Sequence, residues 1–171
     1  RGVLIRGGDA LERAGKVATV VLDKTGTLTT GHPALIDLWI DPAYPDAGVS
    51  TTRATILGLV AGAERPSEHP LGEAIVRAAV AEGIAIPEAD HFSSVPGMGL
   101  EATVDDRKLV IGSAAHLASY GISVGALLSE ASSISRRGRT AVFVAIDGQP
   151  AAVFGVADTL KPTSVAAVKA F

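Results

Sequence analysis

The chain has 171 residues, of which 47% are hydrophobic, 19% charged and 4% aromatic. This length and composition suit one ordinary folded domain with part of another, and they exclude a disordered tail. The net charge is -3, and the only run of basic residues is Arg136, Arg137 and Arg139, which argues against nucleic acid as a partner. The chain has no cysteine, so disulfides, thiolate metal sites and cysteine nucleophiles are excluded.

The two ends of the chain differ in character from its middle. Residues 17–22 form a short apolar, β-branched run that ends at Asp23, which predicts a strand buried on both faces of a parallel sheet. The chain begins with Arg1, and the helical pattern that reaches Phe171 has no stop signal. We therefore expect a piece of a longer protein. No apolar run approaches the roughly 18 residues of a membrane helix, so we expect this piece to be soluble.

Between the ends, the pattern alternates between strands and helices. Strands are expected over residues 35–40, 92–95, 99–104, 108–111, 140–146 and 151–156, with hairpin turns at Asp105-Asp106-Arg107 and Asp147-Gly148. Helices are expected from Ser50 or Thr51 to about Glu64, from Pro70 to Gly83, from Ser113 to Gly121 and from Ser123 to Gly138. The fold class is therefore α+β, with an antiparallel sheet and helices (residues 31–156) inserted into a truncated α/β domain (residues 1–30 and 157–171).

The segment Asp23-Lys-Thr-Gly-Thr-Leu-Thr29 follows the first predicted strand. An Asp at the carboxyl end of a parallel strand lies where α/β sheets bind ligands, and the Gly and Thr residues can turn N–H groups and hydroxyls toward an anion. A carboxylate can also accept a phosphoryl group if cations such as Lys24 and Mg²⁺ offset the charge. By composition alone, a strand end followed by a polar turn is the favoured interpretation, since Asp, Gly and Thr are common turn residues.

The order of these seven residues resembles the phosphorylation motif of P-type cation-transporting ATPases. The resemblance implies that Asp23 is phosphorylated by ATP, that Lys24 contacts the phosphate, and that the main chain of Thr25 helps Asp23 to hold Mg²⁺. It also identifies the truncated α/β domain (residues 1–30 and 157–171) as a haloacid-dehalogenase-like phosphorylation domain. In related phosphatases of that type, a second Asp acts as general acid/base at the position of Thr25. Without it, we expect an acyl-phosphate on Asp23 to be long-lived.

The tetrapeptide Ser67-Glu-His-Pro70 precedes a predicted helix. The helix dipole disfavours imidazolium at His69, so we expect a neutral ring, although a surface cap residue is the plainer alternative. Together with the upstream motif, the tetrapeptide resembles the Ser-Glu-His-Pro signature of the heavy-metal (type IB) branch of P-type ATPases. The resemblance implies a nucleotide site that includes Glu68 and His69, with His69 orienting the adenine ring. It also implies that Glu64 accepts a hydrogen bond from the adenine amino edge, which favours adenine over guanine.

Three further segments resemble parts of the same family. Gly97-Met-Gly99 matches the glycine pair of its nucleotide-binding domain, where only glycine permits close backbone approach, although an ordinary turn would look alike. Gly112-Ser113 stands where the family has Gly-Asn, and Ser113 is alternatively a helix cap. Asp158-Thr-Leu-Lys161 resembles the return into the phosphorylation domain, which implies that Asp158 lies near the hinge and Lys161 near the phosphate.

The resemblance covers essentially the whole chain and implies the ATP-binding cytosolic portion of a heavy-metal P-type ATPase, with copper as the first choice of ion. The implied ligands are ATP and Mg²⁺, and the implied partners are the membrane domain and the remaining cytosolic domains of the same parent chain, at the cytosolic face of a membrane. The family's Gly-Asp-Gly-x-x-x-Asp segment, whose carboxylates hold Mg²⁺, does not occur in the sequence. We therefore expect a monomeric piece that binds ATP without appreciable turnover.

Two other functions fit the sequence. A soluble haloacid-dehalogenase-type phosphatase with a large cap would use Asp23 as its nucleophile, and release of phosphate from small phosphomonoesters would identify it. A non-catalytic docking module would use the inserted domain to bind another cytosolic part of the parent chain. Competition between such a part and ATP would identify the docking module.

Overall fold

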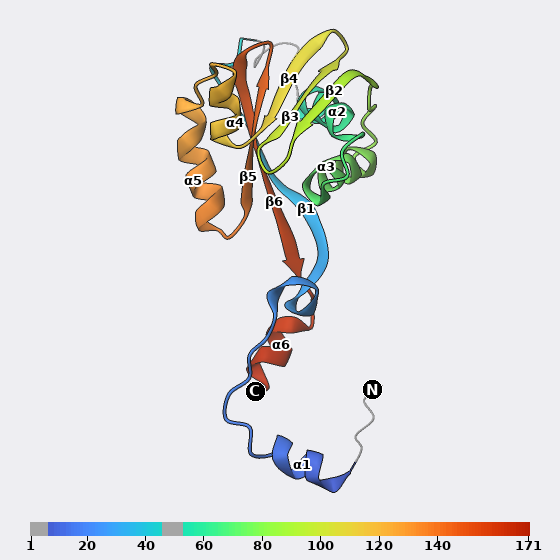
Figure 1. Cartoon of the computed structure of the whole chain (residues 1–171), viewed down its shortest axis with the longest axis vertical. Helices are drawn as coiled ribbons and strands as arrows, with labels where there is room; N and C mark the ends of the chain where they lie inside the picture. The colour runs from blue at the N-terminus through green and yellow to red at the C-terminus, as the bar shows by residue number, and fades with distance from the viewer. Residues whose placement is uncertain (1–6, 46–52) are drawn as a thin grey trace.

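The computed structural model describes residues 7–45 and 53–171. Its centre is a six-stranded antiparallel sheet in the order β1-β6-β5-β4-β3-β2 (Figure 1). The strands are β1 (Thr29–Ile40), β2 (Ala89–Val95), β3 (Gly99–Val104), β4 (Arg107–Gly112), β5 (Thr140–Ile146) and β6 (Gln149–Leu160). The helical segments are α1 (Gly8–Ala14), η1 (Lys24–Leu28), α2 (Arg53–Glu64), α3 (Pro70–Ala81), α4 (Ala114–Ser119), η2 (Gly125–Leu127), α5 (Leu128–Arg136) and α6 (Ser164–Lys169).

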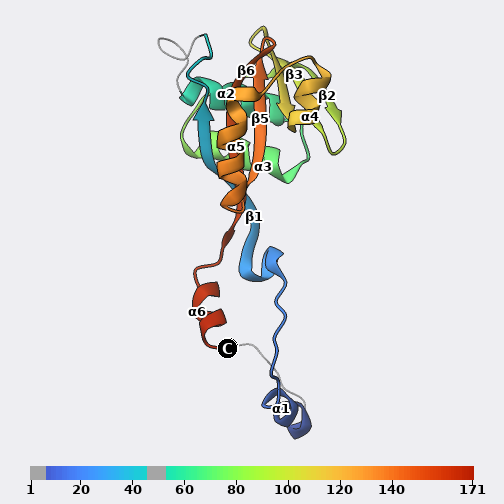
Figure 2. The same cartoon turned by 90° about the vertical axis from the view of Figure 1, so that its left-hand side faces the viewer.

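Helices cover both faces of the sheet (Figures 1 and 2). On one face, α2 and α3 bury Ile56, Val60 and Ile75 against sheet residues such as Leu109 and Phe154. On the other face, α4, η2 and α5 cover a second apolar cluster. That cluster consists of Val110, Leu117, Ile122, Val124, Leu127, Ala131, Ile134, Phe143, Ala145 and Val153. Burial on both faces makes the sheet the rigid support for every segment attached to it.

Both predicted hairpins are confirmed, since β3 pairs with β4 and β5 with β6. Their turns carry residues suited to positive φ. Asp105 and Asp106 have φ of 49° and 60° and connect β3 to β4, while Asp147 and Gly148 have φ of 50° and 76° and connect β5 to β6. Positive φ at both central residues is the type I′ geometry that matches the twist of paired strands. The first loop has two residues rather than three, since Arg107 already belongs to β4.

The helix predictions hold except for one start. The helix from Pro70 is confirmed as α3, and Ser113 caps α4, its hydroxyl accepting from the amide of His116 at 3.2 Å. The cap residues proposed for α2, Ser50 and Thr51, lie outside the described residues. The start at Ser123 is wrong: Val124 is buried against the sheet, and the chain turns only afterwards into η2 and α5, neither of which has a side-chain cap.

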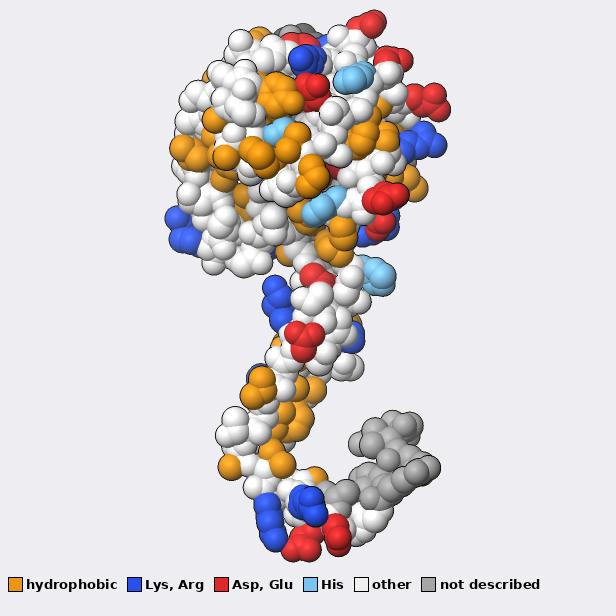
Figure 3. Space-filling view, in the orientation of Figure 1, with side chains coloured by type: hydrophobic (Ala, Val, Ile, Leu, Met, Phe, Trp, Pro, Cys, Tyr) orange, Lys and Arg blue, Asp and Glu red, His pale blue; other side chains and the backbone are white. Residues whose placement is uncertain are grey.

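The strand predicted over residues 17–22 is also wrong. These residues have no regular structure, and the side chains of Val17, Val20 and Val21 are 58%, 45% and 91% exposed. Apolar side chains accordingly lie along the narrow part of the molecule in Figure 3. A parallel strand buries its faces only between neighbours, and all strand pairs among the described residues are antiparallel and belong to the central sheet.

Strands β1 and β6 extend beyond the other strands and leave the sheet side by side (Figures 1 and 2). Their ladder continues to the pair Thr29 and Leu160, next to η1 and the segment before α6. We call this paired extension the neck. The predicted domain limits at residues 31 and 156 fall inside β1 and β6, and they stay a prediction.

We predict that amide protection differs sharply between the sheet and the N-terminal segment. The amide of Val17 donates to the carbonyl oxygen of Ala14 at 3.3 Å, but residues 18–22 lie in no helix or strand. Amides 18–22 should therefore exchange at nearly the rate of an unfolded peptide, whereas central amides of β4 and β5 should exchange only by global unfolding. Hydrogen exchange read by NMR or mass spectrometry measures this difference. Equal protection in both regions would contradict the exposed arrangement of residues 17–22.

Candidate functional site

The Asp23 motif forms a tight, exposed loop. Within η1, Gly26 has a φ of 75°, a conformation that favours glycine and breaks the helical turn. The hydroxyl of Thr29 accepts from the amide of Gly26 at 3.1 Å and lies 3.0 Å from the carbonyl oxygen of Lys24. Thr29 is only 3% exposed, whereas Asp23, Lys24 and Thr25 are exposed. The buried Thr29 therefore shapes the loop, and the three residues predicted for chemistry lie on its open side.

Asp158 on β6, far away in sequence, contacts the residues that follow this loop. The carboxylate of Asp158 accepts from the hydroxyl of Thr29, from the hydroxyl of Thr30 at 3.1 Å and from the amide of Gly31 at 3.0 Å. These donors, the Thr29 hydroxyl first among them, lower the pKa of Asp158 below its ordinary value of 3.8. We call this set of bonds the clasp, and it ties β6 to the start of β1 in the neck.

The clasp is followed by two more contacts to the motif loop. The ammonium of Lys161 donates to the carbonyl oxygen of Gly26 at 2.6 Å, and the hydroxyl of Ser164 donates to the carbonyl oxygen of Leu28 at 2.6 Å. The structure therefore places Asp158 at the neck and brings Lys161 to the loop that follows Asp23. Contact of Lys161 with a phosphate stays a prediction.

The loop offers only part of a magnesium site. Mg²⁺ in proteins is usually held by one or two carboxylates together with waters and substrate phosphates. In residues 7–45 and 53–171, no group of three or more Asp, Glu or His side chains is placed to hold a metal ion. Binding of Mg²⁺ by Asp23 and the main chain of Thr25 stays a prediction.

The carboxyl group of Glu64 is buried at the end of α2. Glu64 is 6% exposed, and its partner is the side chain of Ser67. Burial raises the pKa of Glu64 from 4.5 to about 7, and the Ser67 hydrogen bond opposes the shift without cancelling it. Gly72 on α3 makes room for this carboxyl group, because a Cβ atom at position 72 would overlap Glu64 Oε2. A buried carboxyl group with a strongly shifted pKa beside a cavity marks a candidate functional site.

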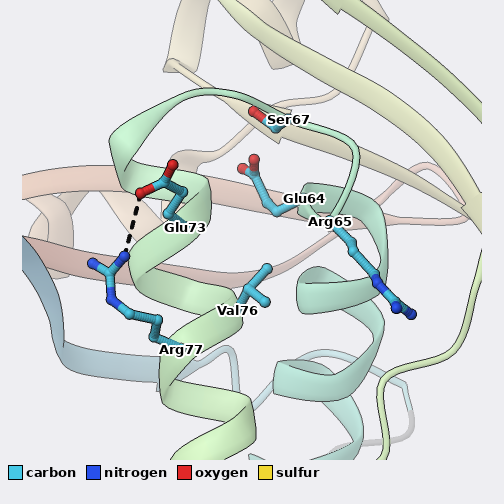
Figure 4. Close-up of a pocket in the computed structure, with 6 residues that line it drawn as sticks. All are labelled: Glu64, Arg65, Ser67, Glu73, Val76 and Arg77. Atoms are coloured by element: carbon cyan, nitrogen blue, oxygen red, sulfur yellow. Dashed lines mark hydrogen bonds and ion pairs between the residues drawn. The ribbon is translucent and has the colours of Figure 1, made fainter.

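The cavity beside Glu64 lies between α2 and α3 (Figure 4). Its volume is about 190 Å³, smaller than the several hundred Å³ of most ligand pockets. The lining residues are Glu64, Arg65, Ser67, Glu73, Val76 and Arg77. Such a cavity can take one end of a ligand rather than the whole of it.

His69 caps α3, the cap role that the sequence also allowed. Its Nδ1 accepts from the amide of Leu71 at 3.2 Å, and its own amide donates to the hydroxyl of Ser67 at 3.2 Å. A ring nitrogen that accepts a hydrogen bond carries no proton, so this geometry fits a neutral ring. His69 and Glu68 are both exposed, and their nucleotide contacts stay predictions.

The glycine segments meet at one end of the β3-β4 ladder. Gly99 lies opposite Gly112, and the amide of Ser113 donates to the carbonyl oxygen of Met98 at 2.9 Å. A Cβ atom at Gly99 would overlap the Ile111 carbonyl oxygen, so this glycine is needed for strand packing whether or not a ligand binds. Gly97 differs: its φ is 73°, and nothing lies within 4 Å of its Cβ position. Gly97 therefore leaves open space above the turn.

His116 was not identified from the sequence. Its side chain is 1% exposed, and its Nε2 lies 3.3 Å from the carbonyl oxygen of Leu100. A Cβ atom at Gly99 or Gly112 would meet this ring, so His116 fills the space that the two glycines leave. No local pattern signals this packing, since it joins α4 to a glycine pair on two strands.

The predicted residues thus gather in three groups. Asp23, Lys24 and Thr25 share a loop with Asp158 and Lys161. Glu64 and the Ser67–Pro70 segment lie between α2 and α3. The glycine turn at residues 97–99 adjoins Gly112 and Ser113 on the sheet.

An exposed aspartate in a Lys-Thr-Gly loop, met by a lysine from a distant segment, is the arrangement expected of a phosphoryl-transfer loop. The family model described as "haloacid dehalogenase-like hydrolase" matches residues 17–171. The chain therefore belongs to the haloacid dehalogenase-like hydrolase family, and the predicted fold class is confirmed.

Within this family, the chain is similar to metal-transporting P-type ATPases, which confirms the resemblance found in the sequence. It is 40% identical over 168 residues to "Probable copper-transporting ATPase PacS" of Synechococcus elongatus, covering 98% of this chain and 22% of that protein. It is 40% identical to "Copper-transporting P-type ATPase" of Rhizobium leguminosarum bv. viciae, covering 99% of this chain and 19% of that protein. The chain thus spans about a fifth of the length of these relatives.

Solved structures give the same assignment. A zinc-transporting PIB-type ATPase in its E2.Pi state superposes with a TM-score of 0.84 at 31% identity, covering 99% of this chain and 26% of that chain. The N-domain of HMA6, a copper-transporting P-type ATPase, superposes with a TM-score of 0.59 at 26% identity, covering 74% of this chain and 99% of that domain. In the part of this chain that the structure describes, no helix is long and apolar enough to cross a bilayer.

We predict that the clasp holds the neck together through the charge of Asp158. In an Asp158→Asn variant, the carboxylate that accepts from Thr29, Thr30 and Gly31 is lost, so the amide of Gly31 should exchange with solvent faster while amides in β4 stay unchanged. Because the pKa of Asp158 is lowered, the clasp should be complete above pH 3.8 and weaken only below it. Hydrogen exchange followed by NMR measures both effects.

The matched control for this prediction is Asp90→Asn, which removes the same charge from an exposed position on β2. Equal exchange at Gly31 in wild type and Asp158→Asn would show that the clasp does not hold the neck.

We predict that Glu64 destabilises the fold at neutral and higher pH. The pKa is about 7 in the folded chain and near 4.5 in the unfolded chain, so stability falls as pH rises from 4.5 to 7 and stays lowered above it. Glu64→Gln should therefore raise the free energy of unfolding at pH 8 by up to about 3 kcal/mol and leave it nearly unchanged at pH 4.5. Urea denaturation at the two pH values measures this difference, with exposed Glu68→Gln as control. An equal effect of Glu64→Gln at both pH values would contradict the buried, shifted carboxyl group.

Proposed function

We propose that this chain is the ATP-binding and phosphoryl-accepting part of the cytosolic region of a heavy-metal P-type ATPase. The observation that carries the proposal is the match to the zinc-transporting PIB-type ATPase over 99% of the chain, with the Asp23 loop and Lys161 in contact. In the longer protein, ATP hydrolysis through Asp23 would drive ion transport.

In the proposed reaction, a carboxylate oxygen of Asp23 attacks the γ-phosphorus of ATP. The bond from this phosphorus to the bridging oxygen breaks, ADP leaves with the electron pair, and an aspartyl-phosphate remains. Water later hydrolyses it to phosphate and restores the carboxylate. Lys24, which is exposed beside Asp23, would offset the phosphate charge, and Lys161 would do so from the other side of the loop.

The nucleoside end of ATP would bind at the helices and the glycine turn. Glu64 would accept from the adenine amino group, and Glu68 and His69 would border the ring at the start of α3. Gly97 and Gly99 would let the ligand approach the β2-β3 turn, while Gly112 and Ser113 would lie beside it. Mg²⁺ would accompany the phosphates, with Asp23 and the Thr25 main chain completing a shell of phosphate oxygens and water.

The proposed cargo is a soft metal ion, with copper first, because the relatives at 40% identity carry copper in their printed names. The proposed partners are the membrane domain and the other cytosolic domains of the same longer chain, and the proposed location is the cytosolic face of the membrane. By itself the chain would bind ATP without turnover, because the family's Gly-Asp-Gly-x-x-x-Asp segment does not occur in its sequence. We also propose that it is a monomer.

We predict that ATP binds this chain weakly and prefers it to GTP. In an NMR titration, the amides of Glu64, His69 and residues 97–99 should shift and saturate with ATP, and the affinity for GTP should be lower. Binding near millimolar suffices, since this corresponds to only about -4 kcal/mol. The absence of shifts at these amides would contradict the proposed nucleotide site.

Release of phosphate from a small phosphomonoester distinguishes the proposed function from that of a phosphatase. The chain should release no phosphate from para-nitrophenyl phosphate above the rate of an Asp23→Asn control. Steady, Asp23-dependent release from that compound or from ATP would contradict the proposed role.

A further inference from the structure

His116 is a polar residue buried next to the glycine segments of the sheet. It is 1% exposed, whereas the other three histidines of the chain, His32, His69 and His91, are exposed. Burying an imidazole costs free energy unless the ring finds hydrogen-bond partners. The partners of His116 therefore indicate what this residue does in the fold.

The ring of His116 is bonded to the main chain at the start of β3. Its Nε2 lies 3.3 Å from the carbonyl oxygen of Leu100. A carbonyl oxygen can only accept a hydrogen bond, so Nε2 carries a proton and acts as the donor. Leu100 directly follows Gly99, and this bond therefore fixes the main chain next to the glycine turn at residues 97–99.

His116 also lies against three residues of the proposed nucleotide site. Its Cδ2 is 2.5 Å from the position of a Cβ atom at Gly99 and 3.1 Å from that of a Cβ atom at Gly112. Its amide donates to the hydroxyl of Ser113 at 3.2 Å. One buried residue thus contacts Gly99, Gly112 and Ser113, although its own side chain is closed to a ligand.

The glycine turn is open at one glycine and filled at the other. Nothing lies within 4 Å of the Cβ position of Gly97, so a ligand has room there. At Gly99, the corresponding space holds the His116 ring and the carbonyl oxygen of Ile111. A ligand that reaches Gly97 therefore meets a turn whose neighbouring main chain is supported by His116.

The ring of His116 is itself held in place. Tyr120, at the end of α4, packs edge-on against it, with ring centroids 5.2 Å apart and planes at 73°. The hydroxyl of Tyr120 is hydrogen-bonded to the side chain of Glu101 on β3. Leu117, the next residue of α4, is fully buried in the second apolar cluster. The ring thus has little freedom to turn away from the glycines, as a positioning residue requires.

Filling the space beside the glycines does not by itself require a histidine. An apolar ring would fill it without the cost of burying a polar group. What the imidazole adds is the Nε2–H donor to the Leu100 carbonyl oxygen. Main chain that already has its bound conformation costs less free energy to order when the ligand arrives. The hydrogen bond therefore fits a role in binding as well as in packing.

We propose that His116 is a positioning residue of the nucleotide site: by donating from Nε2 to the carbonyl oxygen of Leu100, it holds the main chain at Gly99 in the conformation that ATP binds. This inference rests on the proposed function, in which Gly97 and Gly99 let ATP approach the β2-β3 turn. It adds to that function a residue that touches no ligand and acts through the glycine turn.

Two substitutions separate the hydrogen bond of His116 from its packing. His116→Phe keeps a ring in the same space and removes the donor, whereas His116→Gln keeps a side-chain N–H donor and removes the ring. His116→Phe should weaken ATP binding about tenfold, the order of effect of one lost buried hydrogen bond, and His116→Gln should stay within about threefold of the wild type. The control is Ile134→Val, which removes a methylene group from the same apolar cluster on α5. It should lower stability without changing the affinity for ATP.

The test is an NMR titration of the whole 171-residue chain and of these variants with ATP, read at the amides of residues 97–99. Urea denaturation without ATP shows whether each variant is folded under the conditions of the titration. Equal affinity in the wild type and His116→Phe, or an equal loss in His116→Phe and His116→Gln, would overturn this inference and leave the proposed function standing. If the wild type itself does not bind ATP, the proposed function fails.

The wild type alone provides a second readout, which remains if His116→Phe does not fold. In ¹⁵N NMR spectra of the imidazole, Nε2 of His116 should carry a proton, and the ring resonances should shift and saturate with ATP together with the amides of residues 97–99. An Nε2 without a proton, or ring resonances that stay unchanged while those amides saturate, would overturn the positioning role.

Discussion

The pairing of β1 with β6 is the constraint on which both the sheet and the Asp23 loop depend. The ladder runs from Ile40 opposite Ala152 to Thr29 opposite Leu160, and Phe154 and Val156 anchor its upper half in the core. In the neck, the two strands are therefore held together by main-chain hydrogen bonds, because residues 29–34 and 157–160 belong to neither apolar cluster. The loop at the end of the neck is held by the side chains of Thr29, Lys161 and Ser164, which bond to its main chain. Residues 23–25 are therefore exposed in an ordered loop.

The same ladder brings together segments that are 127 to 129 residues apart, and the clasp uses this proximity. Because Thr29 is held opposite Leu160, Asp158 needs no further ordering of the chain to reach the donors of residues 29–31. Lys161 and Ser164 follow directly and bind the carbonyl oxygens of Gly26 and Leu28. The pairing of the first and last strands of the sheet thus brings the Asp23 loop and residues 158–164 together, although they are far apart in sequence.

The sequence could predict the features that local chemistry decides. The turns at Asp105-Asp106 and Asp147-Gly148, the Pro70 helix start and the Ser113 cap each depend on a few adjacent residues, and the structure has all four. Residues 17–22 have the composition of a buried strand, but burial needs neighbours that local sequence does not supply. The family resemblance placed Asp158 near the hinge, but it did not predict the bonds of the clasp. The shifted pKa of Glu64 and the space left by Gly72 arise where α2 packs against α3, and His116 is buried where α4 meets two strands. Residue types along the sequence do not show this packing, even where the partners are only a few residues apart.

Glu64 is a buried carboxyl group whose charge opposes folding. An ionised carboxyl group under α3 costs about 3 kcal/mol at neutral to alkaline pH, which is a large part of the stability of a small domain. The two apolar clusters on the faces of the sheet can offset that cost, but they offer the carboxyl group no partner beyond Ser67. A ligand that entered the cavity beside Glu64 and hydrogen-bonded to its carboxyl group would recover part of this free energy on binding, so the burial that lowers stability would also favour the ligand.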